Sequence, residues 1–355
     1  MDFLLFVGTD HDLSDFEVGA QIPLASPFGK GVYQFSSPCV DQAITITAKL
    51  GSALKLAAFV SASGSDLSPF TLLIDTPNYS ISTLPRDKSL SFTIAGRIKE
   101  LLGNKFRFIV AGDTYGLSPL IVTKQHVSEF FITSDSIFKT VWTHDLHHWI
   151  KKDRHLPFAN AKAGILPPKI ARILINLSGL NGDGKTLLDT FCGSGRVLIE
   201  GFELGYKVIG SDISKDQINE SRANLSSLQI SSDPNTLFVS DAAKLGNHLL
   251  PDSIDLIVTE PFMGKPNTRL DRVPDMVKGL SKLYLGALKS WTKVLKTGGL
   301  VVMVFPRIVT ASKTYLTSTV IDDPHLLGYN VKTRGVLYSK PGATVIREIV
   351  ILAKF

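Results

Sequence analysis

A chain of 355 residues, 44% hydrophobic and 20% charged, can bury the cores of about two domains and is too apolar to be disordered. Its two cysteines, Cys39 and Cys192, exclude a disulfide framework and lack the paired spacing of a structural zinc site, so we expect a cytoplasmic protein. The formal charge of +6 divides into 11 basic and 14 acidic residues in 1–150, against 27 and 18 in 151–355. The basic second half favours a polyanionic partner, with nucleic acid as the leading candidate.

The chain begins with an apolar run at 1–7, which stops at Gly8. The run has neither a basic flank nor a small-residue cleavage site, so we expect no signal peptide. No later stretch approaches the roughly 20 apolar residues that a membrane-spanning helix needs. We therefore expect a soluble protein that does not enter a membrane.

Residues 1–142 predict an α+β domain. Alternating β-branched runs indicate strands and apolar spacing indicates helices, with strands at 42–47, 105–110 and 118–123 and helices at about 50–60 and 91–102. Residues 143–168 are predicted to be a linker, because small residues, Gly164 and the pair Pro167-Pro168 break the periodic patterns. Its dense group His144, Asp145, His147 and His148 is more typical of linker residues that are solvated or packed locally than of a metal site, and we expect no metal.

Residues 169–355 predict a domain in which strands and helices alternate. A helix begins at Lys169, behind the proline pair; the strands that follow are predicted at 186–191, 207–212, 236–240, 254–259, 300–305, 329–338 and 348–353, and further helices near 196–204, 214–228 and 275–296. This alternation implies right-handed βαβ crossovers and an α/β domain with a mainly parallel sheet of about seven strands.

The first three of these strands each end in an acidic residue, at Asp189, Asp212 and Asp241. Ligands of an open parallel sheet bind beyond the carboxyl ends of its strands. Gly193-Ser194-Gly195 follows the first acid and lets the backbone pass close to a ligand. Asp212 can accept both hydroxyl protons of a ribose and Asp241 an adenine amino group, although either could instead cap a turn. Together these residues predict a nucleoside-binding site.

The fourth strand ends in Glu260-Pro261-Phe262-Met263-Gly264. An exocyclic base amine is a poor nucleophile, because its lone pair is delocalised into the ring, so an enzyme must hold it beside the group that it attacks. Glu260 and the Pro261 carbonyl can accept the N–H groups, and Phe262 can stack on the base. The alternative is an ordinary turn with a buried Phe. Lys265, Arg269 and Arg272 follow and could bind phosphates.

A rival motif lies at 179–186, where Gly-Leu-Asn-Gly-Asp-Gly-Lys-Thr matches the phosphate-binding pattern G-x-x-x-x-G-K-[ST]. That pattern works between a strand and a following helix, where the amides of the helix N-terminus meet the phosphates. Here a predicted helix precedes the motif and a predicted strand follows it. We therefore interpret it as a helix-to-strand turn.

Taken together, these residues resemble the THUMP-domain tRNA guanine-N2-methyltransferases, class I enzymes that modify the exocyclic N2 of guanosine. The most specific likeness is at 163–172, Ala-Gly-Ile-Leu-Pro-Pro-Lys-Ile-Ala-Arg, which is similar to the family's G-[MI]-L-P-P-K-[LI]-A segment. Residues 3–17, 118–122 and 145–153 also resemble family segments, so the resemblance spans nearly the whole chain. At 260–264 the family usually has D-P-P-Y-G.

The resemblance implies a THUMP-like RNA-binding module at 1–142, a linker at 143–168 and a Rossmann-like class I methyltransferase domain at 169–355, whose last strand inserts antiparallel. It implies S-adenosylmethionine as the cofactor and tRNA or another structured RNA as the partner; whether a helper subunit exists is left open. The cofactor-binding residues that it implies are Asp189, Phe191, Gly193, Gly195, Asp212, Ile213, Asp241 and Ala242, and the catalytic ones are Glu260, Pro261 and Phe262.

Three alternatives stay open at this point. The same chemistry could act on rRNA guanine or on a DNA amino group. The chain could bind S-adenosylmethionine and RNA without catalysis. It could also be a nucleotide triphosphatase that uses the glycine-rich motif at 179–186.

Overall fold

The computed structural model describes residues 1–8, 11–64, 67–112, 115–159, 166–230, 236–265, 268–339 and 342–355. The chain divides into two compact units, Met1–His148 and Trp149–Phe355, and each is described by itself. Part of the expected linker, with Gly164 and the start of the family-like segment at 163–165, lies outside the described residues. The described part of that linker contains helix α6 (Leu146–Arg154).

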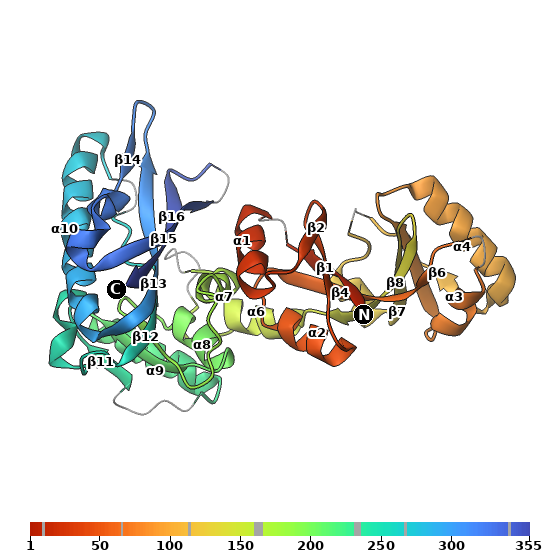
Figure 1. Ribbon diagram of the computed structural model, residues 1–355, viewed down its shortest axis with the longest axis horizontal. Helices are drawn as coiled ribbons and strands as arrows, with labels where there is room; N and C mark the ends of the chain where they lie inside the picture. The colour runs from red at the N-terminus through yellow and green to blue at the C-terminus, as the bar shows by residue number, and fades with distance from the viewer. Residues whose placement is uncertain are drawn as a thin grey trace. The chain divides into compact units, whose positions relative to one another are not determined.

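The first unit is an α+β domain on one eight-stranded sheet, in the order β2-β3-β1-β4-β8-β7-β5-β6 (Figure 1). Its strands are β1 (Asp2–Val7), β2 (Ser26–Gly29), β3 (Val32–Ser36), β4 (Ala53–Ala62), β5 (Asn78–Thr83), β6 (Arg107–Phe108), β7 (Val127–Ile132) and β8 (Ser136–Thr143). Its helices are α1 (His11–Gln21), α2 (Val40–Ala48), α3 (Ser68–Leu73), α4 (Lys88–Leu102) and α5 (Pro119–Lys124). The helix predicted at 91–102 lies within α4, and of the strand predicted at 105–110 only β6 forms.

Two predicted strands of this unit are helices. The run at 42–47 lies in α2, where Ala43 and Thr47 are buried one helical turn apart. A run of six residues was too short to distinguish the two-residue period of a strand from the 3.6-residue period of a helix. The strand predicted at 118–123 is wrong for a different reason, since these residues contain the cap and most of helix α5. The Ser118 hydroxyl accepts a hydrogen bond from the Ile121 amide at 3.4 Å, and Pro119 occupies the first helical turn of α5. This start signal outweighed the β-branched residues behind it.

The helix predicted at about 50–60 is instead the strand β4. It pairs antiparallel with β1 on one side and β8 on the other, so it lies in the interior of the sheet. Its consecutive residues Leu56, Ala57 and Ala58 are all buried. A strand that is buried on both faces carries no polar alternation, and its apolar positions therefore matched helical spacing by chance.

The second unit is an α/β domain on a sheet in the order β11-β10-β9-β12-β13-β16-β15, with β14 paired to β13 (Figure 1). Its strands are β9 (Thr186–Asp189), β10 (Lys207–Asp212), β11 (Leu237–Val239), β12 (Ile254–Thr259), β13 (Leu295–Val309), β14 (Thr314–Leu316), β15 (Tyr329–Tyr338) and β16 (Val345–Lys354). β9 to β13 pair parallel, and β16 runs antiparallel between β13 and β15. All seven predicted strands are present, and the antiparallel insertion of the last one is confirmed.

The helices of the second unit cover its sheet. They are α7 (Pro168–Asn176), α8 (Arg196–Glu203), α9 (Lys215–Ser227) and α10 (Val273–Val294). α10 runs along one side of the sheet in Figure 1 and packs Tyr284, Leu288 and Trp291 into a core with strand residues such as Val301 and Met303. Residues 179–186 lie between α7 and β9, so their interpretation as a helix-to-strand turn is confirmed. In the described part of the chain, no helix combines the length and hydropathy that crossing a membrane requires.

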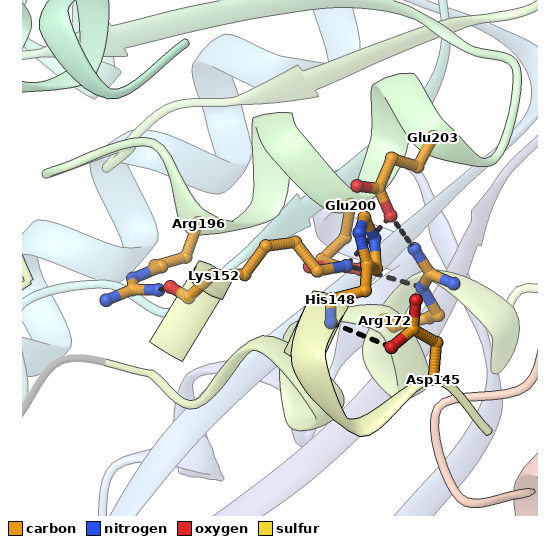
Figure 2. A network of polar contacts seen from close by, with 7 residues as sticks. All are labelled: Asp145, His148, Lys152, Arg172, Arg196, Glu200 and Glu203. Atoms are coloured by element: carbon orange, nitrogen blue, oxygen red, sulfur yellow. Dashed lines mark hydrogen bonds and ion pairs between the residues drawn. The ribbon is translucent and has the colours of Figure 1, made fainter. Parts of the chain in front are cut away.

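A buried ionic network joins α6, α7 and α8 (Figure 2). The Glu200 carboxylate of α8 is 1% exposed and lies 2.8 Å from the Lys152 Nζ of α6 and 2.7 Å from the Arg172 Nε of α7. Glu203 also pairs with both cations. The Trp149 ring carries the Lys152 ammonium 4.1 Å from its centroid. Two cations thus face two carboxylates. The network holds α8 in place, directly after the glycine turn that follows β9.

Asp145, which lies among the histidines, has a local structural role. Its Oδ1 accepts hydrogen bonds from the backbone amides of His147 at 2.9 Å and His148 at 3.1 Å, at the start of α6. A carboxylate in this position satisfies amides that have no partner inside the helix.

Candidate active site

The turn after β9 is held by Asp189, whose side chain is 2% exposed. Its Oδ1 accepts a hydrogen bond from the Phe191 amide at 3.1 Å and one from the Thr259 hydroxyl at 2.6 Å. Asp189 therefore joins the ends of β9 and β12. The turn continues through Gly193 to Gly195, which adopts left-handed φ of +85° and caps α8.

Gly195 leaves no room for a side chain. A Cβ there would lie 2.5 Å from the Oγ of Ser221 on α9, in a backbone conformation that L residues rarely adopt. We expect Gly195→Ala to lower the free energy of unfolding by about 1–3 kcal/mol. Chemical denaturation measures this loss. Ser221→Ala should restore part of the loss, and Gly246→Ala, where a Cβ meets nothing within 4 Å, should show none of it.

Burial raises the pKa of Asp189 to about 7. The Thr259 and Phe191 hydrogen bonds oppose this shift, and the nearby carboxylates of Asp212 and Glu260 add to it. The folded protein therefore keeps a proton that the unfolded chain releases near pH 4.

This shift predicts a dependence of stability on pH. Since the pKa is raised on folding, the contribution of Asp189 is greatest below about pH 4 and is lost as the pH rises to about 7, by about 4 kcal/mol. Asp189→Asn keeps the Oδ1 acceptor and cannot ionise. The difference in unfolding free energy between the two proteins, measured by denaturation from pH 4 to 8, should change across this window. A constant difference would contradict the shift.

The acids at the ends of β10 and β11 also hold their own turns. Asp212 accepts hydrogen bonds from the Gly193 amide at 3.1 Å and from the Ser214 amide at 2.9 Å. Asp241 accepts one from the Ala243 amide at 3.0 Å and begins a 3₁₀ turn (Ala242–Asn247). Because a carboxylate has about four lone-pair sites, both acids keep acceptor capacity for a ligand.

A cavity of about 850 Å³ opens where the parallel strands end. Its walls come from the turns after β9, β10, β11 and β12, together with the first turn of α9, α10 and the start of β16. It is lined by Thr190, Phe191, Asp212, Ile213, Gln217, Ser240, Asp241, Ala242, Glu260, Pro261, Phe262, Met263, Gly264, Lys265, Met276, Leu283, Val345 and Arg347. A second cavity of about 360 Å³ shares Phe262 and Lys265 with it and is lined by Arg272.

The turn after β12 is braced from two sides. The buried Tyr284 hydroxyl of α10 donates a hydrogen bond to the Phe262 carbonyl at 2.7 Å. The Glu260 carboxylate, 12% exposed, forms an ion pair through Oε1 with the Nε of Arg347 on β16. Phe262 itself is 53% exposed, so its ring is available for stacking.

The structure brings most of the predicted site residues to this one cavity. Of the predicted cofactor residues, those that line it are Phe191, Asp212, Ile213, Asp241 and Ala242. Asp189, Gly193 and Gly195 lie behind that wall and shape the turn. All three predicted catalytic residues, Glu260, Pro261 and Phe262, line the same cavity.

Sequence reasoning missed the site residues that do not come from the ends of parallel strands. Arg347 and Val345 lie on an antiparallel strand, and Tyr284 lies in the middle of α10. Gln217 of α9 and Met276 and Leu283 of α10 also line the cavity. For the strand, the available signal was the charged pair Arg347-Glu348 inside an otherwise apolar run.

Comparisons with known proteins agree with this geometry. Residues 158–320 match the model of the RMKL-like methyltransferase domain family. The structure of TrmN from Thermus thermophilus aligns over 100% of both chains, with a TM-score of 0.54 and 17% identity, which shows a shared fold. The second unit has the class I methyltransferase fold, as predicted.

Three archaeal relatives are similar in sequence. A protein named "Probable tRNA (guanine(10)-N2)-dimethyltransferase" from Methanothermococcus thermolithotrophicus is 35% identical over 115 residues, 32% of this chain and 70% of that protein. The tRNA (guanine(10)-N2)-dimethyltransferase of Methanothermobacter thermautotrophicus is 34% identical over 40% of this chain and 39% of its own length. The tRNA (guanine(10)-N2)-dimethyltransferase of Pyrococcus abyssi is 33% identical over 44% of this chain and 42% of its own length. The chain thus spans about two fifths of the length of these last two relatives.

Proposed function

This chain belongs to the family of the tRNA guanine-N2-methyltransferases, and from that premise we propose that it transfers the methyl group of S-adenosylmethionine to the exocyclic N2 of a guanosine in tRNA. One observation carries the proposal. A single cavity joins the acidic ends of β10 and β11 to the turn at Glu260–Phe262. A cofactor at the first place and a base at the second would meet inside it.

The residues present fit S-adenosylmethionine. Asp212 and Asp241 face the cavity with acceptor capacity for ribose hydroxyls and an adenine amine, and the exposed Ile213 offers an apolar surface beside them. The Thr190 hydroxyl is buried at the cavity wall and has no hydrogen-bond partner among the described residues. The left-handed Gly193 and Gly195 keep side chains out of this turn.

The turn after β12 would hold the base. Glu260 and the Pro261 carbonyl accept the N2–H groups and orient the amine, while Phe262 stacks on the ring. When bound beside Asp212 and Asp241, S-adenosylmethionine would supply an electrophilic sulfonium methyl group to the N2 amine. Glu260 takes the proton that N2 releases. Positioning and exclusion of water supply most of the rate, without a covalent enzyme intermediate.

The basic residues of the second half support an RNA substrate. Lys265 and Arg272 line the second cavity beside Phe262, where they can contact phosphates on either side of the target nucleotide. We also propose that the first unit is a THUMP-like module that binds the RNA, and that the protein acts in the cytoplasm, where tRNA is modified.

The direct test is to incubate the purified chain with unmodified tRNA transcripts and labelled S-adenosylmethionine, then to digest the RNA and identify the methylated nucleoside. We expect N2-methylguanosine. Cofactor binding without incorporation into tRNA would contradict the proposal and favour another acceptor or a protein that binds without catalysis. The melting temperature distinguishes the remaining alternative, because S-adenosylmethionine, and not ATP, should raise it.

A further inference from the structure

Arg347 lines the cavity although it lies on β16, an antiparallel strand of the sheet. β16 runs antiparallel to β13, and Arg347 is in register with Pro306 of β13 and Tyr338 of β15. The start of β16 therefore lies at the edge where the parallel strands end. This places a guanidinium in a wall built mainly from the ends of parallel strands and from helices α9 and α10.

The setting of Arg347 is well defined. Its guanidinium carbon lies 5.8 Å from the centroid of the Tyr338 ring, and its Nε donates a hydrogen bond to Glu260. The side chain is 19% exposed. Within the described part of the chain, its two Nη groups make no hydrogen bond. Because Arg347 also lines the cavity, its two Nη groups are available as donors there while Nε bonds Glu260.

The cavity is lined by charged residues of both signs. Among the lining residues, Asp212, Asp241 and Glu260 are acidic, and Lys265 and Arg347 are basic. Arg347 pairs with Glu260, so a positive and a negative group lie next to each other in this wall of the cavity. A carboxylate that accepts hydrogen bonds and a guanidinium that donates them lie side by side in the lining of one cavity.

We propose that the Glu260–Arg347 pair reads the Watson–Crick edge of the target base and selects guanine, with Glu260 accepting N1–H and N2–H and Arg347 donating to O6. This rests on the proposed function and names the residue that determines its base specificity. Guanine is the base whose edge carries an acceptor followed by two donors. The pair offers the complementary order of donor and acceptor.

The other bases do not match this pair. Adenine presents an amine where Arg347 needs an acceptor and a bare N1 where Glu260 needs a donor. Cytosine fails in the same way. Uracil offers O4 and N3–H but has no amine to methylate. A site with buried polar groups rejects a ligand that leaves them unpaired.

The test for turnover replaces O6 of the target guanine by sulfur and, separately, changes Arg347. We compare tRNA that has guanosine at the methylated position with tRNA that has 6-thioguanosine there, because sulfur accepts hydrogen bonds weakly. Wild type should lose roughly 5- to 150-fold in kcat/KM with the thio base. Arg347→Gln should lose a similar factor on guanosine and show almost no further thio effect. Equal thio effects in both proteins would overturn the assignment.

Two further variants control for structure. Arg334→Gln removes an arginine of the neighbouring strand, whose partners Asp322, Ser318 and Glu348 lie outside the cavity, and should leave the thio effect at the wild-type value. Arg347→Lys keeps the cation beside Glu260 without the fork, and should retain the fold while reducing the thio effect. A full thio effect in Arg347→Lys would also count against the O6 contact.

A binding measurement tests the pair without turnover. The protein is saturated with S-adenosylhomocysteine and titrated with guanosine 5′-monophosphate or adenosine 5′-monophosphate. We expect preference for the guanine nucleotide in wild type and its loss in Arg347→Gln; equal binding by wild type would overturn the assignment. If wild type prefers the guanine nucleotide but methylates no tRNA, the proposed function fails and the base assignment stands.

Discussion

A Glu260→Gln protein is expected to bind S-adenosylmethionine and tRNA as wild type does and to lose about 100- to 10,000-fold in kcat. Glutamine keeps an oxygen for the Arg347 hydrogen bond, so the turn should persist. It cannot take the proton that N2 releases, and its NH₂ group would face the N–H groups of the base. Single-turnover methylation, with separate binding titrations for cofactor and tRNA, measures these quantities.

The matched control is Asp255→Asn. Asp255 lies on the same strand, β12, is 16% exposed and pairs with Lys296 at 2.8 Å, but it is near the start of the strand, away from the cavity. Its substitution should leave kcat within a factor of about three, since near-surface pairs contribute little. Wild-type turnover by Glu260→Gln would remove Glu260 from the chemistry, and equal losses in both variants would indicate a structural role.

Glu200→Gln is expected to lower the free energy of unfolding by about 3–5 kcal/mol. Glu200 is 1% exposed and contacts both Lys152 and Arg172, so the change leaves two buried cations with a shared partner, Glu203, that is 23% exposed (Figure 2). An unbalanced buried charge costs far more than a surface pair contributes. Urea denaturation monitored by circular dichroism measures the loss.

Asp271→Asn serves as the control for this network. Asp271 is 57% exposed and pairs with Arg269, which is 83% exposed, so the substitution should change the unfolding free energy by less than about 1 kcal/mol. Lys152→Met combined with Glu200→Gln should recover part of the loss, because a charge of each sign is removed together. A Glu200→Gln protein as stable as wild type would show that the network contributes specificity of packing rather than stability.

The second unit was predictable because its strands and helices alternate strongly. Strands β10 and β12, each a short apolar run bounded by turns, matched their predicted limits, and the acids at their ends marked the edge of the cavity. The first unit was harder. In β4, burial on both faces removed the alternation of polar and apolar residues by which a strand is recognised. In α5, the helix start at Ser118-Pro119 outweighed the β-branched residues that follow it.

The part of the site that the sequence could not show depends on distant pairing. Arg347 reaches Glu260, 87 positions earlier, through the antiparallel register of β16 against β13 and β15. No local pattern encodes that register. The protonation of Asp189 is similar, because it depends on burial between β9 and β12, which lie 70 positions apart in sequence at Asp189 and Thr259.

The antiparallel position of β16 also has a consequence during synthesis. Each of its sheet neighbours, β13 and β15, leaves the ribosome before it, and β13 keeps an unpaired edge until Val345–Lys354 arrives. A nascent chain could therefore form the acidic turns of β9 to β12 while Glu260 still lacks its arginine. The turns after β9 to β12 would thus be in place before β16 adds Arg347, and the cavity is complete only when this last strand has paired.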